Sequence, residues 1–225
     1  MKNYLIYTYD EAIEVIEEIG LLPLAKLVPN YPSLDSITSK DHWYSGSELD
    51  PWMWHVEFAV DGVAAYGKFI KKKSVLISRK ILPLVRIILG SAQPLEKRYD
   101  DGMVSREALE LYRHIHEEPG IDTRLLRAKA GMKDKEKKKP FDNALLELQG
   151  SMDIVVSGTK AKTNKLGEKN GWSSTSFETM EYWTENNDVK ALSMDIEEAK
   201  MELKEHFSRI CSPESIKGWE KIFKF

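Results

Sequence analysis

The sequence is poor in cysteine and has no long apolar run. Its 225 residues include a single cysteine, Cys211, which excludes an internal disulfide and a cysteine-based zinc site. A reducing, cytoplasmic setting is the natural expectation for such a chain. The strongest apolar run, ILPLVRIILG, is interrupted by Pro83 and Arg86 and is far shorter than the roughly 20 residues that cross a bilayer. The acidic N-terminal segment lacks the cleavage pattern of a signal peptide, so we expect no membrane partner.

Several catalytic motifs are also missing. There is no GxxxxGK[ST] phosphate loop, no G-x-S-x-G elbow and no H-E-x-x-H metal motif, so nothing supports nucleotide hydrolysis, serine-hydrolase chemistry or metal catalysis. His114 and His116 lie two positions apart on an expected helix and therefore point to different sides, which prevents them from chelating a metal. We expect neither a metal site nor a cofactor.

Charge is unevenly distributed along the chain. The whole sequence has 33 Lys/Arg and 36 Asp/Glu, a net charge of −3. Residues 121–170 hold 12 Lys/Arg and 7 Asp/Glu, a net charge of +5, which leaves −8 on the remainder. A basic segment on an acidic protein indicates a phosphate-binding surface, and it is equally typical of a solvated lysine-rich face.

Residues 1–95 predict helices around a β-hairpin. A helical repeat of apolar residues predicts a helix over residues 9–22, capped by Asp10. Asp50-Pro51 is typical of a second helix start. The stretch AAYGKFIKKKSVLIS predicts two strands, and Ser78 is expected to cap a helix over residues 79–89. The segment SAQPLEKRYDDG is the expected linker to the next domain.

Residues 103–185 have the order of a winged helix-turn-helix. We expect a helix from Ser105 to Glu117, a short helix beginning near Asp122, and a third helix that begins at Pro140. A strand over residues 153–157, a loop and a polar strand over residues 172–179 follow. C-terminal helices are expected over residues 186–225. The predicted fold class is therefore α+β, mainly helical.

The predicted winged helix supplies the candidate nucleic-acid contacts. In this fold the third helix fits a major groove and the hairpin loop reaches the neighbouring backbone. Asn143 and Gln149 on the third helix are candidates for base-edge contacts. The candidates for phosphate contacts are the lysines of the loop, Lys160, Lys162, Lys165 and Lys169. We expect double-stranded DNA as the partner; the alternative is a packing, dimerisation or regulatory module that contacts protein, and the oligomeric state stays open.

The densest aromatic stretch is DHWYSGSELDPWMWHVEF. Trp52 and Trp54 cannot share one face of a helix, so at least one of them points away from the core. An exposed tryptophan could stack on an unpaired base, with Tyr66 or Lys68 completing a pocket. The alternative is that the tryptophans pack the N-terminal helix against the hairpin.

Two carboxylates near this stretch are candidates for catalysis. Asp50 or Glu57 could position water or stabilise a cationic sugar during removal of a base. Asp50 is also well placed to cap the helix that begins at Pro51, and this structural interpretation is the stronger one.

Several stretches resemble a group of bacterial AlkZ-related proteins. The resemblance is carried by FDNALLELQGSMDIVVSG, GEKNGWSSTSFETMEYW, DPWMWHVEF and AAYGKFIKKKSVLIS, and it covers residues 9–183. The group is similar to a winged-helix superfamily that includes the AlkZ/YcaQ-type DNA glycosylases of DNA repair.

The resemblance implies binding of duplex DNA by winged helices around a channel. In the glycosylases, a Gln-x-Gln or Gln-x-Asp motif assists removal of an alkylated or crosslinked base. This chain has only Gln93, in QPL, and Gln149, in QGS, so neither motif is present. The resemblance thus implies DNA binding without the standard catalytic motif; the alternative is a glycosylase that uses an unrecognised carboxylate.

Overall fold

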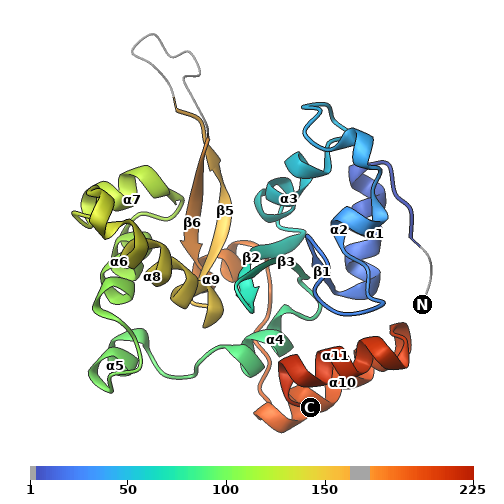
Figure 1. The fold of residues 1–225 in the computed structure, drawn as a ribbon. Coiled ribbons are helices and arrows are strands. Elements are labelled where there is room, and N and C mark those ends of the chain that lie inside the picture. Colours follow the sequence, from blue (N-terminus) through green and yellow to red (C-terminus); the bar gives the residue numbers. More distant parts are fainter. Residues whose placement is uncertain (1–3, 163–172) are drawn as a thin grey trace.

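The computed structural model describes residues 4–162 and 173–225, and helices surround a single sheet in it (Figure 1). The strands are β1 (Leu21–Pro23), β2 (Ala64–Ile70), β3 (Lys73–Ser78), β4 (Ile121–Asp122), β5 (Ile154–Lys160) and β6 (Ser174–Thr179). The helices are α1 (Tyr9–Ile19), α2 (Leu34–Ile37), η1 (Lys40–His42), α3 (Pro51–Val60), α4 (Leu82–Leu89), α5 (Leu95–Asp100), α6 (Arg106–Glu117), α7 (Thr123–Lys129), η2 (Lys135–Lys137), α8 (Lys138–Gly150), α9 (Met180–Asn186), α10 (Ile196–Ile210) and α11 (Pro213–Phe223). The mixed, mainly helical class predicted from the sequence is confirmed.

The sheet joins the two halves of the molecule. Its strands follow the order β1–β3–β2–β5–β6–β4, and every pair is antiparallel. In Figure 1, α1–α3 lie on one side of the β5–β6 hairpin and α6–α8 on the other. The junction is the pairing of β2 with β5, where Tyr66 lies opposite Val156. The sheet therefore crosses the predicted boundary between residues 95 and 103, while the division into domains stays a prediction.

Helix α1 shows how a local signal sets an element's limits. Thr8 and Glu11 form a capping box at its start, so Thr8, and not Asp10, is the N-cap. The helix ends at Ile19, earlier than predicted, because Gly20 adopts a φ of 79°. The three following residues then pair as β1 with β3. Strand β1 is short and apolar and follows the apolar end of α1 directly, so the sequence pattern could not separate the strand from the helix.

Helix α4 begins three residues later than predicted. Ser78 does not cap it, because this residue lies in β3 opposite Ala64 and is held in the sheet. The helix begins at Leu82, with Pro83 in its first turn, where a proline costs no helical hydrogen bond. Helix α4 packs against α10.

The predicted linker contains a helix. Residues 95–100 form α5, whose Leu95 and Arg98 are buried. The guanidinium of Arg98 forms an ion pair with Asp153, which in turn accepts a hydrogen bond from Ser151. This contact fastens α5 to the start of β5, and a sequence without an apolar repeat could not predict it.

The β5–β6 hairpin contains a bulge at a glycine. The register shifts between Val156 and Gly158, and Gly158 has a φ of 152°. A Cβ atom on Gly158 would lie 3.4 Å from a methyl group of Val60. The positive φ at the bulge therefore favours glycine, while the contact with α3 alone would also admit a Cβ atom.

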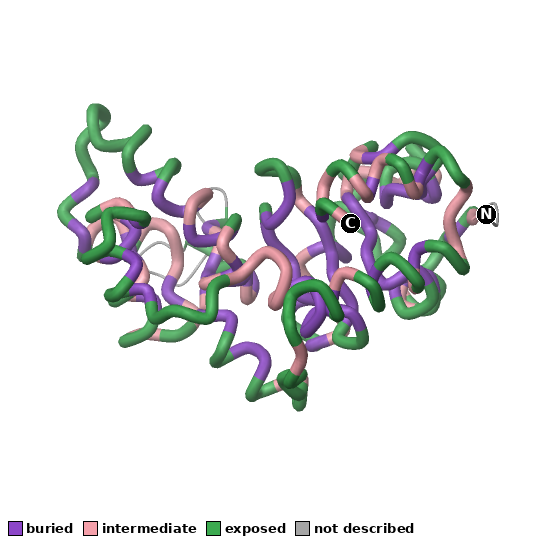
Figure 2. The backbone as a smooth tube through the Cα atoms, turned by 90° about the horizontal axis from the view of Figure 1, so that it is seen from below, coloured by how far each residue is buried: buried purple, intermediate pink, exposed green. Residues whose placement is uncertain are grey.

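The C-terminal helices dock onto the body through aromatic side chains. Trp219 is buried, stacks on Phe207 at 4.9 Å and meets the edge of Tyr31 at 4.9 Å. Figure 2 shows buried segments through the middle of the molecule and exposed turns at its outer ends. Within the described part of the chain, no helix combines the length and apolar character needed to span a bilayer.

Candidate nucleic-acid interface

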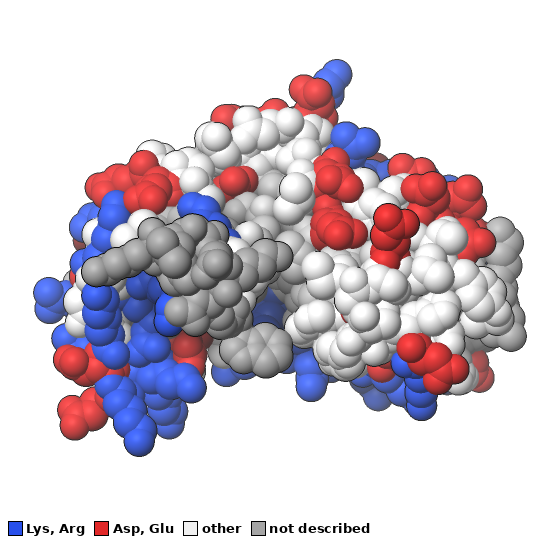
Figure 3. Space-filling model, turned by 90° about the horizontal axis from the view of Figure 1, so that it is seen from above, with Lys and Arg blue, Asp and Glu red and all other residues white. Residues whose placement is uncertain are grey.

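The turn between α7 and α8 carries a cluster of cations. Five exposed lysines make up this basic corner: Lys133, Lys135, Lys137, Lys138 and Lys139. Figure 3, seen from the hairpin side, shows Lys and Arg side chains gathered on the half that holds α6–α8, whereas the other half is mainly white and red. The cations of the basic segment thus lie together in space as well as in sequence.

The basic corner occupies an unfavourable place on α8. Lys137 is the N-cap residue, its side chain caps nothing, and the first turn contains no acidic residue. The N-terminus of a helix carries a partial positive charge, so lysines there are repelled by about 0.3–1 kcal/mol each when exposed. The corner nevertheless has a defined shape, because Lys137 donates to the Gly131 carbonyl and Arg127 lies over the Phe141 ring.

The loop end of β5 is held against α7. Arg124 on α7 donates to the carbonyl of Lys160 at 3.0 Å and also bonds Asp122. Burial opposes ionisation of Asp122, but hydrogen bonds from Ser174 and Arg124 lower its pKa. Lys160 and Lys162 are exposed at the end of the described strand. The described hairpin lysines therefore lie on the side of the hairpin next to α7; Lys165 and Lys169 lie outside the described residues.

The two predicted base-edge residues have different surroundings. Asn143 is exposed on α8, as predicted. Gln149 is only 4% exposed: its amide oxygen accepts the Lys68 backbone N–H at 2.9 Å, and its amide nitrogen donates to the Leu145 carbonyl. The expectation that Gln149 is exposed to a base is wrong, because the residue instead ties α8 to β2.

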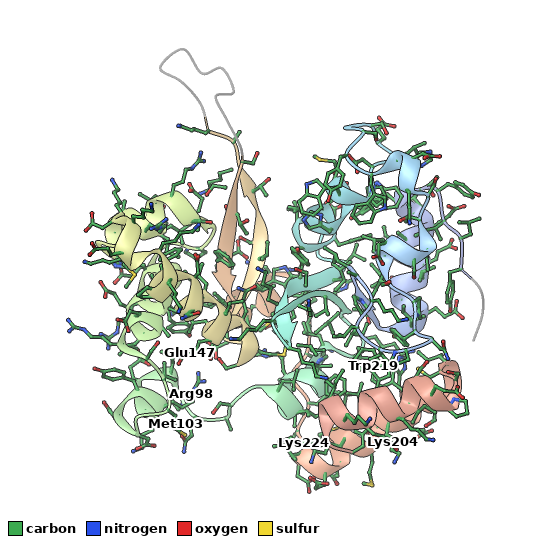
Figure 4. All side chains as sticks on the ribbon, viewed as in Figure 1. Arg98, Met103, Glu147, Lys204, Trp219 and Lys224 are labelled. Atoms are coloured by element: carbon green, nitrogen blue, oxygen red, sulfur yellow. The ribbon has the colours of Figure 1, made fainter. Side chains whose placement is uncertain are left out.

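Glu147 does not face the solvent freely either. Its carboxylate accepts both the backbone N–H and the hydroxyl of Ser105, at 2.8 and 2.6 Å. Figure 4 shows it on α8 near the segment that leads into α6. The Glu147 carboxylate is thus engaged in packing α8 against the start of α6.

The aromatic stretch separates into a core residue and a surface residue. Trp54 is 1% exposed, and its indole N–H donates to the Glu48 carbonyl at 2.8 Å. Trp52 is 43% exposed. Tyr66 is buried in β2, and the Lys68 side chain is exposed. A pocket that includes Trp54 is therefore excluded, because this ring packs inward near Tyr9.

The two candidate carboxylates have different surroundings. Asp50 is 1% exposed and accepts three backbone N–H groups, from Tyr44, Gly46 and Trp52. It is the predicted N-cap of α3, with no free oxygen directed to solvent. Glu57 is exposed, and partial burial together with the charge of Asp61 raises its pKa.

A pocket of about 710 Å³ lies away from this surface, at the base of the molecule. It is formed by α4, α5 and the start of α9. The charged and polar side chains that line it include Arg86, Arg98, Tyr112, Asp153 and Glu181. Burial lowers the pKa of Arg86 and raises that of Tyr112 to about 12. The charges of both signs balance within the pocket, so it has no clear preference for an anion.

The sequence prediction missed several residues of the candidate interface. The lysines of the basic corner were visible as a charge cluster, and the count over residues 121–170 was the signal for them. Arg124 and Arg127 belong to the same count, but the charge count could not predict their individual roles, which depend on contacts with Lys160 and Phe141.

Comparison with known proteins identifies a family for this chain. A family model described as AlkZ related matches residues 6–224, nearly the whole chain, which confirms the resemblance found in the sequence. No curated protein and no solved structure matches the chain.

Proposed function

The chain belongs to the AlkZ-related family, and from this premise we propose that it is a DNA-repair-related protein that binds double-stranded DNA. The binding unit is a winged helix in which α6, α7 and α8 precede the β5–β6 hairpin as the wing. In this unit α8 is the helix directed to the major groove, and the hairpin reaches the adjacent backbone.

The position of the basic corner carries this proposal. Lysines at the N-terminus of α8 lower the stability of the helix, and a bound anionic partner would offset this cost. Lys160 and Lys162 extend the same surface onto the wing. Lysines on two adjacent elements match the phosphates of a duplex, and their binding releases counterions. Asn143, exposed on α8, is the remaining candidate for a base-edge contact.

We propose binding without the family's standard base-removal chemistry. The motif of the glycosylases requires a glutamine followed two positions later by Gln or Asp, which the sequence does not contain. Gln149 is also occupied by its bonds to β2 and α8, and Asp50 by three backbone N–H groups.

Fluorescence anisotropy with a short fully paired duplex tests the proposal. Affinity is measured over a series of salt concentrations for the wild type and for a variant with Lys138, Lys139, Lys160 and Lys162 replaced by alanine. We expect the variant to bind more weakly. The slope of log affinity against log salt should fall by up to about 0.9 for each lysine that contacts a phosphate.

A matched control removes the same charge from the opposite end of the molecule. Lys204, Lys217, Lys221 and Lys224 are exposed on the C-terminal helices, far from the hairpin in Figure 4, where Lys204 and Lys224 are labelled. Their replacement by alanine should leave the salt slope unchanged. Equal effects of the two sets would mean nonspecific attraction, and absence of binding at low salt would overturn the proposed function.

A further inference from the structure

An exposed aromatic surface lies on the half opposite the basic corner. Tyr44 is 72% exposed and Trp52 43%, and their ring centroids are 5.3 Å apart. Met53 and Val60 on α3 are exposed beside them, at 48% and 61%. Large exposed apolar groups that contact one another indicate a binding surface rather than a random surface residue.

The surface continues inward as a series of ring contacts. Trp52 lies 4.5 Å from His55, and His55 lies 5.0 Å from Tyr66 in β2. Both inner rings are buried, so they fix the position of the outer pair. Tyr44 is held from the other side, because its backbone N–H donates to Asp50 at 3.0 Å. The exposed rings are therefore preorganised before a ligand arrives.

This surface faces the hairpin. Trp52, Val56 and Val60 recur every four residues and so share one face of α3. Val60 of this face lies close to Gly158 in β5, two residues before Lys160. Tyr66 at the inner end of the ring series lies opposite Val156 of the same strand. A duplex held by the wing would consequently lie next to Trp52.

The charge of the aromatic surface decides what it can hold. Residues 41–67 contain five carboxylates, of which Asp50 is buried and four are exposed, and no Lys or Arg; the exposed Lys40 and Lys68 border this stretch. A phosphate backbone is repelled there, whereas the uncharged face of a nucleobase stacks well on Trp and Tyr. A single base displaced from the duplex satisfies both conditions, because its phosphates stay with the basic half.

We propose that Tyr44 and Trp52 form a stacking site for one nucleobase displaced from a bound duplex. The inference rests on the proposed function. In this arrangement the basic half binds the phosphates and the half with α3 binds an unpaired base. The protein recognises the flat face of the base by stacking, without hydrogen bonds to its edge.

Two duplexes that differ by one bulged nucleotide test the site. Anisotropy compares the affinity for the bulged and the fully paired duplex, and 2-aminopurine as the bulged base reports stacking through quenching of its fluorescence. The wild type should prefer the bulged duplex by roughly 5- to 100-fold, the range given by stacking of one base on an aromatic ring. Trp52→Ala and Tyr44→Ala should reduce both the preference and the quenching, and Trp52→Phe should retain most of each.

Tyr182→Ala is the matched control, because Tyr182 is 42% exposed on α9, outside this surface. It should leave the preference intact. A wild type without preference, or a preference that persists in Trp52→Ala, would overturn the stacking site while leaving DNA binding in place. Absence of binding to either duplex would overturn the site together with the proposed function. A Trp52→Ala variant that instead dissociates a dimer would assign the surface to a second copy of the chain.

Discussion

Helices α3 and α8 flank the β5–β6 hairpin from opposite sides, and their first turns are built in opposite ways. At α3, Asp50 caps the helix by accepting the Trp52 N–H, and Pro51 occupies the first helical position, where its missing N–H costs no helical hydrogen bond. At α8, the start has no side-chain cap and is surrounded by lysines. One start is built for stability, and the other is weakened by charges that an anionic partner would neutralise. This difference supports the proposed assignment of the phosphates to the α8 side.

The largest expected effect is a difference in stability between alanine variants of the two tryptophans of α3. Trp54→Ala removes a fully buried ring and its hydrogen bond, so it should lower the free energy of unfolding by about 3–5 kcal/mol. Trp52→Ala should cost about 1 kcal/mol or less, since this ring is half exposed. Urea denaturation of both variants measures the difference, and equal losses would contradict the division into core and surface.

The next effect concerns the buried imidazole between α3 and β2. Burial lowers the pKa of His55 from 6.5 to about 4, so the folded protein resists a proton that the unfolded chain accepts. Stability should be complete above pH 6.5 and should fall as the pH drops toward 4, by at most roughly 3 kcal/mol. His55→Phe should remove this part of the pH dependence. Denaturation curves at several pH values test it, and identical slopes for both proteins would exclude His55 as the source.

A smaller loss is expected at the junction of the two halves. Gln149→Ala leaves the Lys68 backbone N–H in β2 without its partner, which should cost about 1–3 kcal/mol. Asn143→Ala, on the exposed face of the same helix, should change stability by about 0.5 kcal/mol or less. If the two substitutions had the same effect, the role of Gln149 as a tie between α8 and β2 would be refuted.

The smallest effect has the opposite sign. Lys138→Glu places a negative charge in the first turn of α8 and should raise stability by about 0.3–1 kcal/mol, while it weakens DNA binding. Lys221→Glu, in the last turn of α11, should instead lower stability because a cation is favourable there. Thermal unfolding and anisotropy, measured on the same samples, check both. A loss of stability in Lys138→Glu would show that the lysines of the basic corner stabilise the folded protein, which contradicts the expected repulsion at the start of α8.

The elements predicted well were those whose local signals agree with their tertiary contacts. The starts of α3 and α6 follow from Asp50 and Ser105, which both accept a backbone N–H of their helix. Gln149 was misplaced because a polar residue on a helix gives no sign that another strand will supply its partner. The helix α5 was missed for a related reason, since its anchor is an ion pair with a residue 55 positions away.

The sequence by itself determined the family, the mainly helical class and the location of the basic segment, because these depend on motifs, local periodicity and charge counts. The tertiary structure decided that Trp52 is exposed and Trp54 buried, that Gln149 is buried, and that the two halves lie on opposite sides of the hairpin. Those outcomes depend on the pairing of β2 with β5, a contact between residues 90 positions apart, Tyr66 and Val156. Long-range pairing of this kind sets burial, and no local pattern encodes it.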